Sequence, residues 1–168
     1  MKVRYIDPSK CIGCRACEVA CEREHGGIAH VTVYIVENAE ICIPYACRHC
    51  ENAPCVAVCP TGAMNRLDTG AVVVNPLLCI GCRMCQIVCP FGIPVFEPRL
   101  NVMVKCDLSR DRASQGLPPA CVATCPTGAT FLAEEAELVQ MKRELETKKI
   151  VSAVMRAQQL SREGLLRY

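Results

Sequence analysis

The hydrophobic positions follow two different patterns, one before residue 133 and one after it. Before it, the β-branched runs "HVTVYIV" at 30–36 and "EICIPY" at 40–45 predict two strands that pair across residues 37–39. The stretch "LDTGAVVVNP" at 67–76 predicts a hairpin turn that leads into a further strand. This part of the pattern therefore predicts short β-hairpins.

The segment from Ala133 onward has a helical pattern. It contains no cysteine or proline and is rich in Ala, Glu, Leu, Lys, Gln and Arg, which are strong helix formers. One or two helices are predicted over roughly 133–163. Apolar residues that can share a helix face recur along it: Leu138, Met141, Leu145, Val151, Val154, Met155 and Leu160. These helices either cover the preceding core or dock a partner subunit or another copy of this chain.

The composition shows that a large apolar core cannot hold this fold. Sixteen of the 168 residues are cysteine, Trp is absent, and there are only three Phe and four Tyr. A small chain of this kind needs disulfides or metals. The net charge of +2 gives no argument for nucleic-acid binding.

The N-terminus and the hydropathy of the chain lead us to expect a cytoplasmic location. The start "MKVRYIDPSKC" lacks the apolar core of a signal peptide and a twin-arginine pair. No apolar run reaches the ~18 residues of a membrane span. In the cytoplasm thiols stay reduced, and clustered cysteines more often bind metal than pair with each other.

Fifteen of the cysteines fall into four successive motifs. The motifs are "CIGCRACEVAC" with Cys11, Cys14, Cys17 and Cys21; "CRHCENAPCVAVCP" with Cys47, Cys50, Cys55 and Cys59; "CIGCRMCQIVCP" with Cys79, Cys82, Cys85 and Cys89; and residues 105–126 with Cys106, Cys121 and Cys125. Three of the four motifs end in Cys-Pro-x-Gly. Such self-similarity indicates that one small unit is repeated.

The spacing C-x2-C-x2-C-x3-C-P is the ferredoxin run that binds 4Fe–4S clusters. Three cysteines on a tight loop can reach three iron corners of a cubane, and the fourth cysteine ligates the other cluster of a pair. We expect this fourth cysteine to open a short helix, because the proline after it suits a helix start. Gly13 and Gly81 give the loops permissive backbone positions. Zinc would need two well-separated C-x2-C pairs, so the spacing favours iron–sulfur.

Several residues near the motifs have more than one interpretation. Cys42 lies in a predicted strand outside every motif. It is either a small buried hydrophobic residue or a spare cluster ligand. His49, inside "CRHC", either hydrogen-bonds a cluster sulfur or is an ordinary loop histidine; His25 and His30 are the other histidines. Basic residues beside the motifs could raise cluster potentials, dock an acidic partner or be ordinary solvated charges: Arg15, Arg48, Arg83 and Lys105.

With all four motifs considered, the chain resembles the four-cluster ferredoxin subunits of multi-subunit redox enzymes. This family includes the iron–sulfur subunits of dimethyl sulfoxide reductase, formate dehydrogenase, formate hydrogenlyase, carbon monoxide dehydrogenase and tungsten aldehyde oxidoreductase complexes. The resemblance covers about residues 1–131 and includes the wider gap in "CENAPC". It implies an α+β fold of two pseudo-symmetric bacterial ferredoxin-like dicluster modules with short β-hairpins, residues 1–132. A C-terminal helical extension, residues 133–168, would serve partner docking or self-assembly.

The resemblance also implies how the ligands share four clusters. The implied sets are Cys11, Cys14 and Cys17 with Cys125; Cys47, Cys50 and Cys55 with Cys89; Cys79, Cys82 and Cys85 with Cys59; and Cys106, Cys121 and Cys21 with whatever stands at position 109.

Two positions depart from the family pattern. Glu22 stands where the other motifs have proline, which we expect to change a helix start and not a ligand. Ser109 stands where a cysteine is expected, so fifteen motif cysteines face sixteen ligand positions. The fourth site would then hold a 3Fe–4S cluster, or a 4Fe–4S cluster completed by Ser109, Asp107, Asp111 or solvent, or one completed by Cys42. A thiolate is the softer and preferred iron ligand.

The function that these features imply is electron transfer without catalysis on this chain. Electrons would pass through the clusters between a catalytic subunit, a Mo/W-pterin or Ni enzyme, and a further redox subunit. We expect a cytoplasmic anaerobic system for aldehyde, formate, CO or H2 chemistry, with no nucleic acid and no membrane span. The alternatives are a filament-forming polyferredoxin that wires many catalytic units, and a free diffusible ferredoxin.

Overall fold

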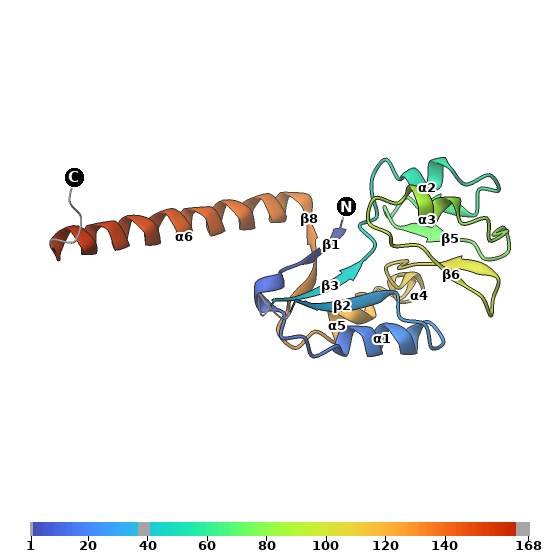
Figure 1. Cartoon of the computed structure of the whole chain (residues 1–168), viewed down its shortest axis with the longest axis horizontal. Helices are drawn as coiled ribbons and strands as arrows, with labels where there is room; N and C mark the ends of the chain where they lie inside the picture. The colour runs from blue at the N-terminus through green and yellow to red at the C-terminus, as the bar shows by residue number, and fades with distance from the viewer. Residues whose placement is uncertain (1, 37–40, 164–168) are drawn as a thin grey trace. The chain divides into compact units, whose positions relative to one another are not determined.

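The computed structural model describes residues 2–36 and 41–163, and the chain divides into two compact units. Unit 1 spans Met1–Leu132 and contains all sixteen cysteines; unit 2 spans Ala133–Tyr168. Unit 1 combines short strands with short helices, and unit 2 is dominated by one helix (Figure 1). No helix in the described part of the chain is long and apolar enough to cross a membrane.

The strands of the chain pair two by two and form no larger sheet in the described residues. β2 (Val31–Val36) pairs antiparallel with β3 (Ile41–Ala46), as the sequence predicts. The predicted connection, 37–39, lies outside the described residues. The other pairs are β4 (Met64–Arg66) with β5 (Val72–Val74), β6 (Val95–Glu97) with β7 (Val102–Val104), and β1 (Lys2–Ile6) with β8 (Thr130–Glu134).

Unit 1 has two separate buried clusters, and cysteines take part in both. The first consists of Cys17, Cys21, Val31, Val33, Ala46, Cys106 and Cys121. The second consists of Ala53, Cys55, Met64, Val72, Cys85 and Met103. The first joins the two ends of unit 1, because its members come from residues 17–46 and 106–121, whereas the second comes from the chain between them. As the composition predicts, neither cluster is a large apolar core.

The short helices of unit 1 lie at the third cysteine of each motif. They are α1 (Ala16–Glu24), α2 (Pro54–Ala57), α3 (Met84–Val88) and α5 (Ala120–Ala123). A single turn, η1 (Pro8–Lys10), precedes the first motif, and α4 (Arg110–Ser114) lies inside the fourth.

The prediction that the fourth cysteine opens a helix is wrong. Cys59, Cys89 and Cys125 instead follow the ends of α2, α3 and α5, and none of them lies in a helix. A residue that precedes proline is driven from helical to extended backbone. Cys89, before Pro90, accordingly has φ −72° and ψ 114°. The proline in these motifs therefore ends a helix.

The same reasoning corrects the expectation for Glu22. Without a proline at this position α1 continues through Cys21 and ends at Glu24. Glu22 therefore changes where the helix ends and not where it starts. As a result Cys21 is a helical residue, unlike the fourth cysteines of the other motifs.

Unit 2 consists mainly of α6 (Glu135–Arg162), a single helix of 28 residues that confirms the helical pattern after Ala133. It starts at a capping box, in which the backbone N–H of Glu134 donates to the Glu137 carboxylate at 2.8 Å. None of its residues is buried.

Candidate metal centres

Three cavities of unit 1 are each lined by four cysteines drawn from two motifs. The first is lined by Cys11, Cys14, Cys17 and Cys125. The second is lined by Cys47, Cys50, Cys55 and Cys89. The third is lined by Cys59, Cys79, Cys82 and Cys85. We call these groups site 1, site 2 and site 3; each unites three cysteines of one motif with the last cysteine of another.

The loops that carry the first two cysteines of each motif share one backbone feature. The residue before the second cysteine has a positive φ in every motif, at Gly13 (69°), His49 (49°), Gly81 (66°) and Leu108 (61°). This left-handed turn curls the loop so that successive side chains can converge. Leu108 holds the same turn, so the fourth motif begins like the others although it lacks their second cysteine.

Glycine is required at position 13 for a second reason. A Cβ atom built there would lie 2.7 Å from Sγ of Cys42 and 3.6 Å from its Cβ. Cys42 is half-buried on β3 and packs against the first buried cluster. It therefore lies against the loop of site 1, and its side chain takes part in packing.

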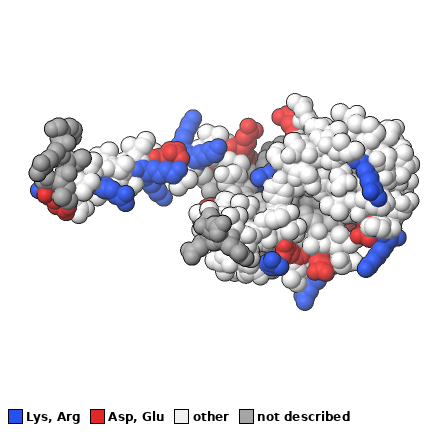
Figure 2. Space-filling view, viewed as in Figure 1, with Lys and Arg blue, Asp and Glu red and all other residues white. Residues whose placement is uncertain are grey.

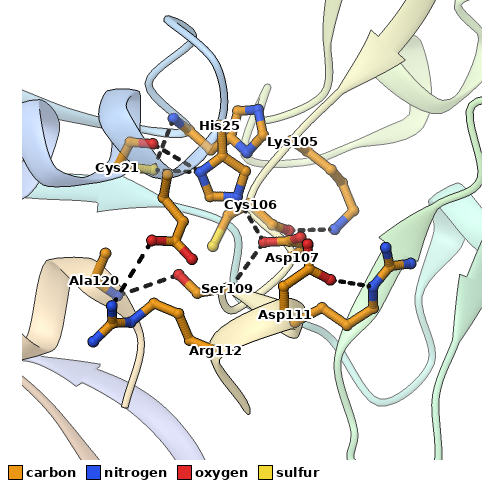
Figure 3. Close-up of polar contacts among 12 residues, drawn as sticks. Cys21, His25, Lys105, Cys106, Asp107, Ser109, Asp111, Arg112 and Ala120 are labelled. Atoms are coloured by element: carbon orange, nitrogen blue, oxygen red, sulfur yellow. Dashed lines mark hydrogen bonds and ion pairs between the residues drawn. The ribbon is translucent and has the colours of Figure 1, made fainter. Parts of the chain in front are cut away.

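A fourth group of thiols lies in the first buried cluster. Cys21, Cys106 and Cys121 are all buried there, and we call them, with Ser109, site 4. Ser109 is only 7 % exposed, and its Oγ accepts a hydrogen bond of 3.2 Å from the backbone N–H of Ala120, the neighbour of Cys121 (Figure 3). Ser109 thus joins the two ends of the fourth motif.

The backbone at Ser109 differs from that at the cysteines it replaces. Ser109 has φ 51° and is the N-cap of α4. In the first and third motifs the left-handed N-cap is the residue after the second cysteine, Arg15 for α1 and Arg83 for α3. Cys14 and Cys82 are absent from the residues with positive φ. The helix of the fourth motif therefore begins one position early.

Two histidines and an aspartate contact the residues of site 4: His25, His30 and Asp107. Figure 3 shows His25 and Asp107. Nε2 of His25 lies 3.0 Å from Oδ1 of Asp107, and the same oxygen accepts from the backbone N–H of Ser109 at 2.9 Å. On its other side, Nδ1 of His25 lies 2.8 Å from the Cys21 carbonyl oxygen and 3.6 Å from its Sγ. The backbone N–H of His30 donates to the same sulfur at 3.2 Å.

The contact between His25 and Asp107 shifts both partners toward their charged forms. Hydrogen bonds to Asp107 and then to Cys21 raise the pKa of His25 to about 10, against desolvation. Burial acts to raise the pKa of Asp107, but the hydrogen bond and charge of His25 prevail and bring it to about 2. The remaining oxygen candidate, Asp111, is exposed and pairs with Arg110 at 3.4 Å.

Burial and backbone hydrogen bonds act on the thiols of these sites in opposite directions. Burial raises the pKa of the third cysteine in each motif, to about 11 for Cys17 and Cys85, and also that of Cys55 and Cys121. These thiols hold their protons until a metal displaces them.

Backbone N–H groups also point at sulfur in several sites. Met64 donates to Cys59, Met103 to Cys79 and His49 to Cys47, each at 3.4 Å. Such N–H···S contacts stabilise a cluster sulfur when it carries negative charge.

The backbone N–H of His49 contacts Cys47 of site 2, and among the described residues its ring is held by the backbone of Val72. Its Nδ1 accepts from the backbone N–H of Val72 at 2.9 Å, which fixes the tautomer with the proton on Nε2. Burial, and then the charges of Lys105 and Arg4, lower the pKa of His49 to about 3. This residue is therefore a neutral, packed histidine.

Arg4 is a functional candidate that the sequence patterns do not indicate. It lies on β1, outside every motif, and is 8 % exposed. Lys105, considered as one of several basic residues beside the motifs, is 4 % exposed. Lys105 directly follows the short apolar strand β7, and this position is a sequence signal for it, because a basic residue is rarely buried without a partner.

The donor set of the four sites fits iron–sulfur clusters. Sites 1 to 3 offer only thiols on tight, left-handed loops, and soft thiolates are the ligands of such clusters. All sixteen cysteines are free, so none is consumed by a disulfide. Site 4 offers three thiols and the oxygen-bearing Ser109 and Asp107.

Two family models match the chain. A 4Fe-4S dicluster domain matches residues 38–135, and a 4Fe-4S binding domain matches residues 4–24. Together the two matches include every cysteine motif.

Three characterised relatives have similar sequences. The B subunit of the anaerobic dimethyl sulfoxide reductase of Escherichia coli is 35% identical over 74% of this chain and 69% of its own length. The thiosulfate reductase electron transfer subunit PhsB of Salmonella typhi is 42% identical over 76% of this chain and 72% of its own. The electron transport protein HydN of Escherichia coli is 39% identical over 84% of this chain and 94% of its own.

The resemblance that the cysteine spacing indicates is therefore confirmed: the chain belongs to the family of ferredoxin-type electron-transfer iron–sulfur subunits that contain 4Fe-4S dicluster domains.

Proposed function

We propose that this protein is the electron-transfer subunit of a multi-subunit oxidoreductase, with four iron–sulfur clusters that relay electrons between a catalytic subunit and another redox partner. The observation that carries the proposal is the convergence of four cysteines from two motifs at each of sites 1, 2 and 3. Three 4Fe–4S clusters would be held there by these twelve cysteines.

Site 4 would hold the remaining cluster through Cys21, Cys106 and Cys121. Its type is either 3Fe–4S or 4Fe–4S with a non-cysteine ligand, and we favour the second. Ser109 is buried, and its backbone N–H donates to Asp107, so two oxygen-bearing side chains lie at the site. Oγ of Ser109 already accepts from Ala120, however, and ligation would add to or displace that contact.

The exchange of cysteines between motifs explains why the clusters would work as a relay. Cys59 and Cys89 each follow a helix of one motif and line the site of the other, so sites 2 and 3 share two short helices, α2 and α3. Cys21 and Cys125 link sites 1 and 4 in the same way, through α1 and α5. The result is two pairs of neighbouring centres, one in each of two pseudo-symmetric modules.

The protein's own residues would supply ligation, burial and hydrogen bonds, and the clusters would supply reversible acceptance of single electrons. N–H groups of Met64, Met103 and His49 favour the more negative state of the sulfurs they contact. No step on this chain requires a general acid or base, which is why we assign it no catalytic residue.

Exposed apolar side chains near the cysteine loops favour a subunit over a free diffusible ferredoxin. Leu77 is 92% exposed, Ile87 81%, Ile12 66% and Ile80 63%, in or next to the loops of sites 1 and 3. Charged side chains are sparse over the face of unit 1 in Figure 2, and both signs occur. Exposed apolar side chains that gather into one patch mark partner contacts.

The partner would be a molybdenum or tungsten pterin enzyme or a nickel enzyme in a cytoplasmic anaerobic system. The relatives named for an anaerobic dimethyl sulfoxide reductase and a thiosulfate reductase support a reductase as the catalytic partner. Aldehyde, formate, CO and H2 remain the substrates that we propose for the catalytic subunit.

A second candidate function, self-assembly into a filament that wires many catalytic units, is favoured by α6. This helix has 28 residues and buries none of them, although its apolar residues include Leu145, Ile150 and Met155, exposed by 53%, 63% and 64%. A helix gains most of its stability from packing its apolar face. A partner, either another copy or the catalytic subunit, would provide that packing.

Controlled-potential coulometry on the anaerobically purified chain tests the relay. Each cluster accepts one electron, so four clusters predict that the chain takes up as many electrons as it has cysteine motifs. Uptake of fewer electrons than there are cysteine motifs would contradict the four-cluster relay.

A further inference from the structure

Unit 1 contains two buried cations without a carboxylate partner. Arg4 is 8% and Lys105 4% exposed, and neither takes part in any ion pair among residues 2–36 and 41–163. Nε and Nη1 of Arg4 are buried without a hydrogen-bond partner in the described chain. A buried cation is costly unless an anion and hydrogen bonds compensate it.

Lys105 points at site 2. Its Nζ lies 3.6 Å from Sγ of Cys47 and donates to the carbonyl oxygens of Cys106, at 2.7 Å, and Val72. The side chain also lines the cavity of site 2. Its charge is thus next to one ligand of site 2, and its backbone precedes Cys106, a ligand of site 4.

Arg4 lies beside site 2 as well. Its Nη2 donates to the carbonyl oxygen of Cys47 at 3.5 Å. The guanidinium therefore lies beside Cys47, the same ligand of site 2 that Lys105 contacts.

We propose that Arg4 and Lys105 are the counter-cations of the clusters at sites 2 and 4, which raise the reduction potentials of these two centres and so determine where an electron rests between the two halves of the relay. This inference rests on the proposed function. A cluster ligated by thiolates is an anion that becomes more negative on reduction, so a fixed buried positive charge favours its reduced form.

Sites 1 and 3 have no equivalent among the described residues. Arg15, beside site 1, has a side chain that is 59% exposed and pairs with Glu18 at 3.8 Å. Arg83, beside site 3, is exposed and stacks over the ring of Phe96, 4.0 Å from its centroid. Solvent and salt screen charges of this kind. The two buried cations therefore raise only the potentials of the centres they contact.

The test is a potentiometric titration followed by EPR on the full chain, with iron and sulfide counted in each sample. Lys105→Met and Arg4→Met remove the charge and keep an apolar stem. We expect the potential of the centre at site 2 to become more negative in both variants. The centre at site 4 should follow in Lys105→Met, because the Lys105 ammonium also donates to the carbonyl oxygen of Cys106, a ligand of that site. Arg83→Met is the matched control and should leave all potentials in place. Unchanged potentials in both charge-removal variants would overturn the proposal.

Arg4→Lys covers the case in which the methionine variants assemble no clusters. Recovery of cluster content with the charge restored would support a counter-cation, and loss in Arg4→Lys as well would mean that the guanidinium is needed for shape alone. Wild-type protein without clusters would count against the proposed function itself. Intact clusters whose potentials stay the same in both charge-removal variants would count only against this inference.

Discussion

Nε2 of His25 lies 3.0 Å from Oδ1 of Asp107, although 82 residues separate the two in the sequence. The contact connects the end of α1, which carries Cys21, to the loop that carries Cys106 and Ser109. The contact therefore holds together the two segments that carry the cysteines of site 4, which come from opposite ends of unit 1.

Replacement of Asp107 by Asn should weaken site 4 selectively. The variant removes the charge that pairs with His25, and leaving a half-buried partner unsatisfied costs on the order of 1–3 kcal/mol. We expect faster release of iron from one centre to a chelator, followed anaerobically by absorbance, with the other centres unchanged. Asp111→Asn is the control, because Asp111 is exposed. Equal release rates in the two variants would show that the contact does not hold the site.

Replacement of Ser109 by Cys should alter a single centre. The change supplies the sixteenth motif cysteine, and a thiolate binds iron more readily than a hydroxyl. We expect the EPR spectrum and potential of one cluster to change while three keep theirs, and iron content to rise if the wild-type centre is 3Fe–4S. Ser114→Cys adds a thiol on the exposed face of α4 and should change no centre. A spectrum of Ser109→Cys identical to wild type would mean that position 109 does not face the cluster.

Replacement of Gly13 by Ala should destabilise unit 1 more than replacement of Gly62 by Ala. Both glycines have a similar φ, 69° and 67°, so both pay about 1 kcal/mol for a left-handed alanine. Only at Gly13 would the new Cβ meet Cys42, at 2.7 Å, and overpacking of this kind costs ~1–3 kcal/mol more. Denaturant midpoints of the anaerobic proteins measure the difference.

The excess cost at Gly13 should shrink in a Cys42→Ala background, because the clashing sulfur is gone. An excess that persists would place its origin elsewhere in the loop.

Removal of residues 133–168 should abolish large assemblies and leave the clusters in place. Unit 2 contains no cysteine, and α6 has no buried residue. Light scattering and iron content, measured on the same anaerobic samples, would show the two effects separately. Retained assemblies would contradict a role of α6 in self-association. Loss of a co-purifying catalytic subunit would instead show that α6 docks that subunit.

The sequence predicts those parts of the structure that depend on local spacing. Cys79, Cys82 and Cys85 lie on one loop, so their convergence follows from the motif, and the β-branched run at 30–36 predicts β2 directly. The prediction for the short helices of the cysteine motifs is wrong, because the effect of Pro90 on the preceding Cys89 outweighs the preference of proline for a helix start.

Contacts between distant segments could not be predicted in this way. Nothing local distinguishes Arg4 from an ordinary solvated arginine on an edge strand, and only the folded chain places it beside Cys47. The contact of His25 with Asp107 likewise depends on how the two ends of unit 1 meet. Tertiary packing, and not spacing, decides which polar residues surround each site.

The central claim is that four groups of side chains hold four iron–sulfur clusters in two close pairs. EPR of the anaerobically purified full chain, as isolated and after strong reduction, tests it most directly when iron is quantified in the same samples. The account predicts complex, magnetically coupled signals on reduction, with either a silent oxidised sample or one near-isotropic signal from a 3Fe–4S centre at site 4. Little or no iron in freshly prepared anaerobic protein would contradict it.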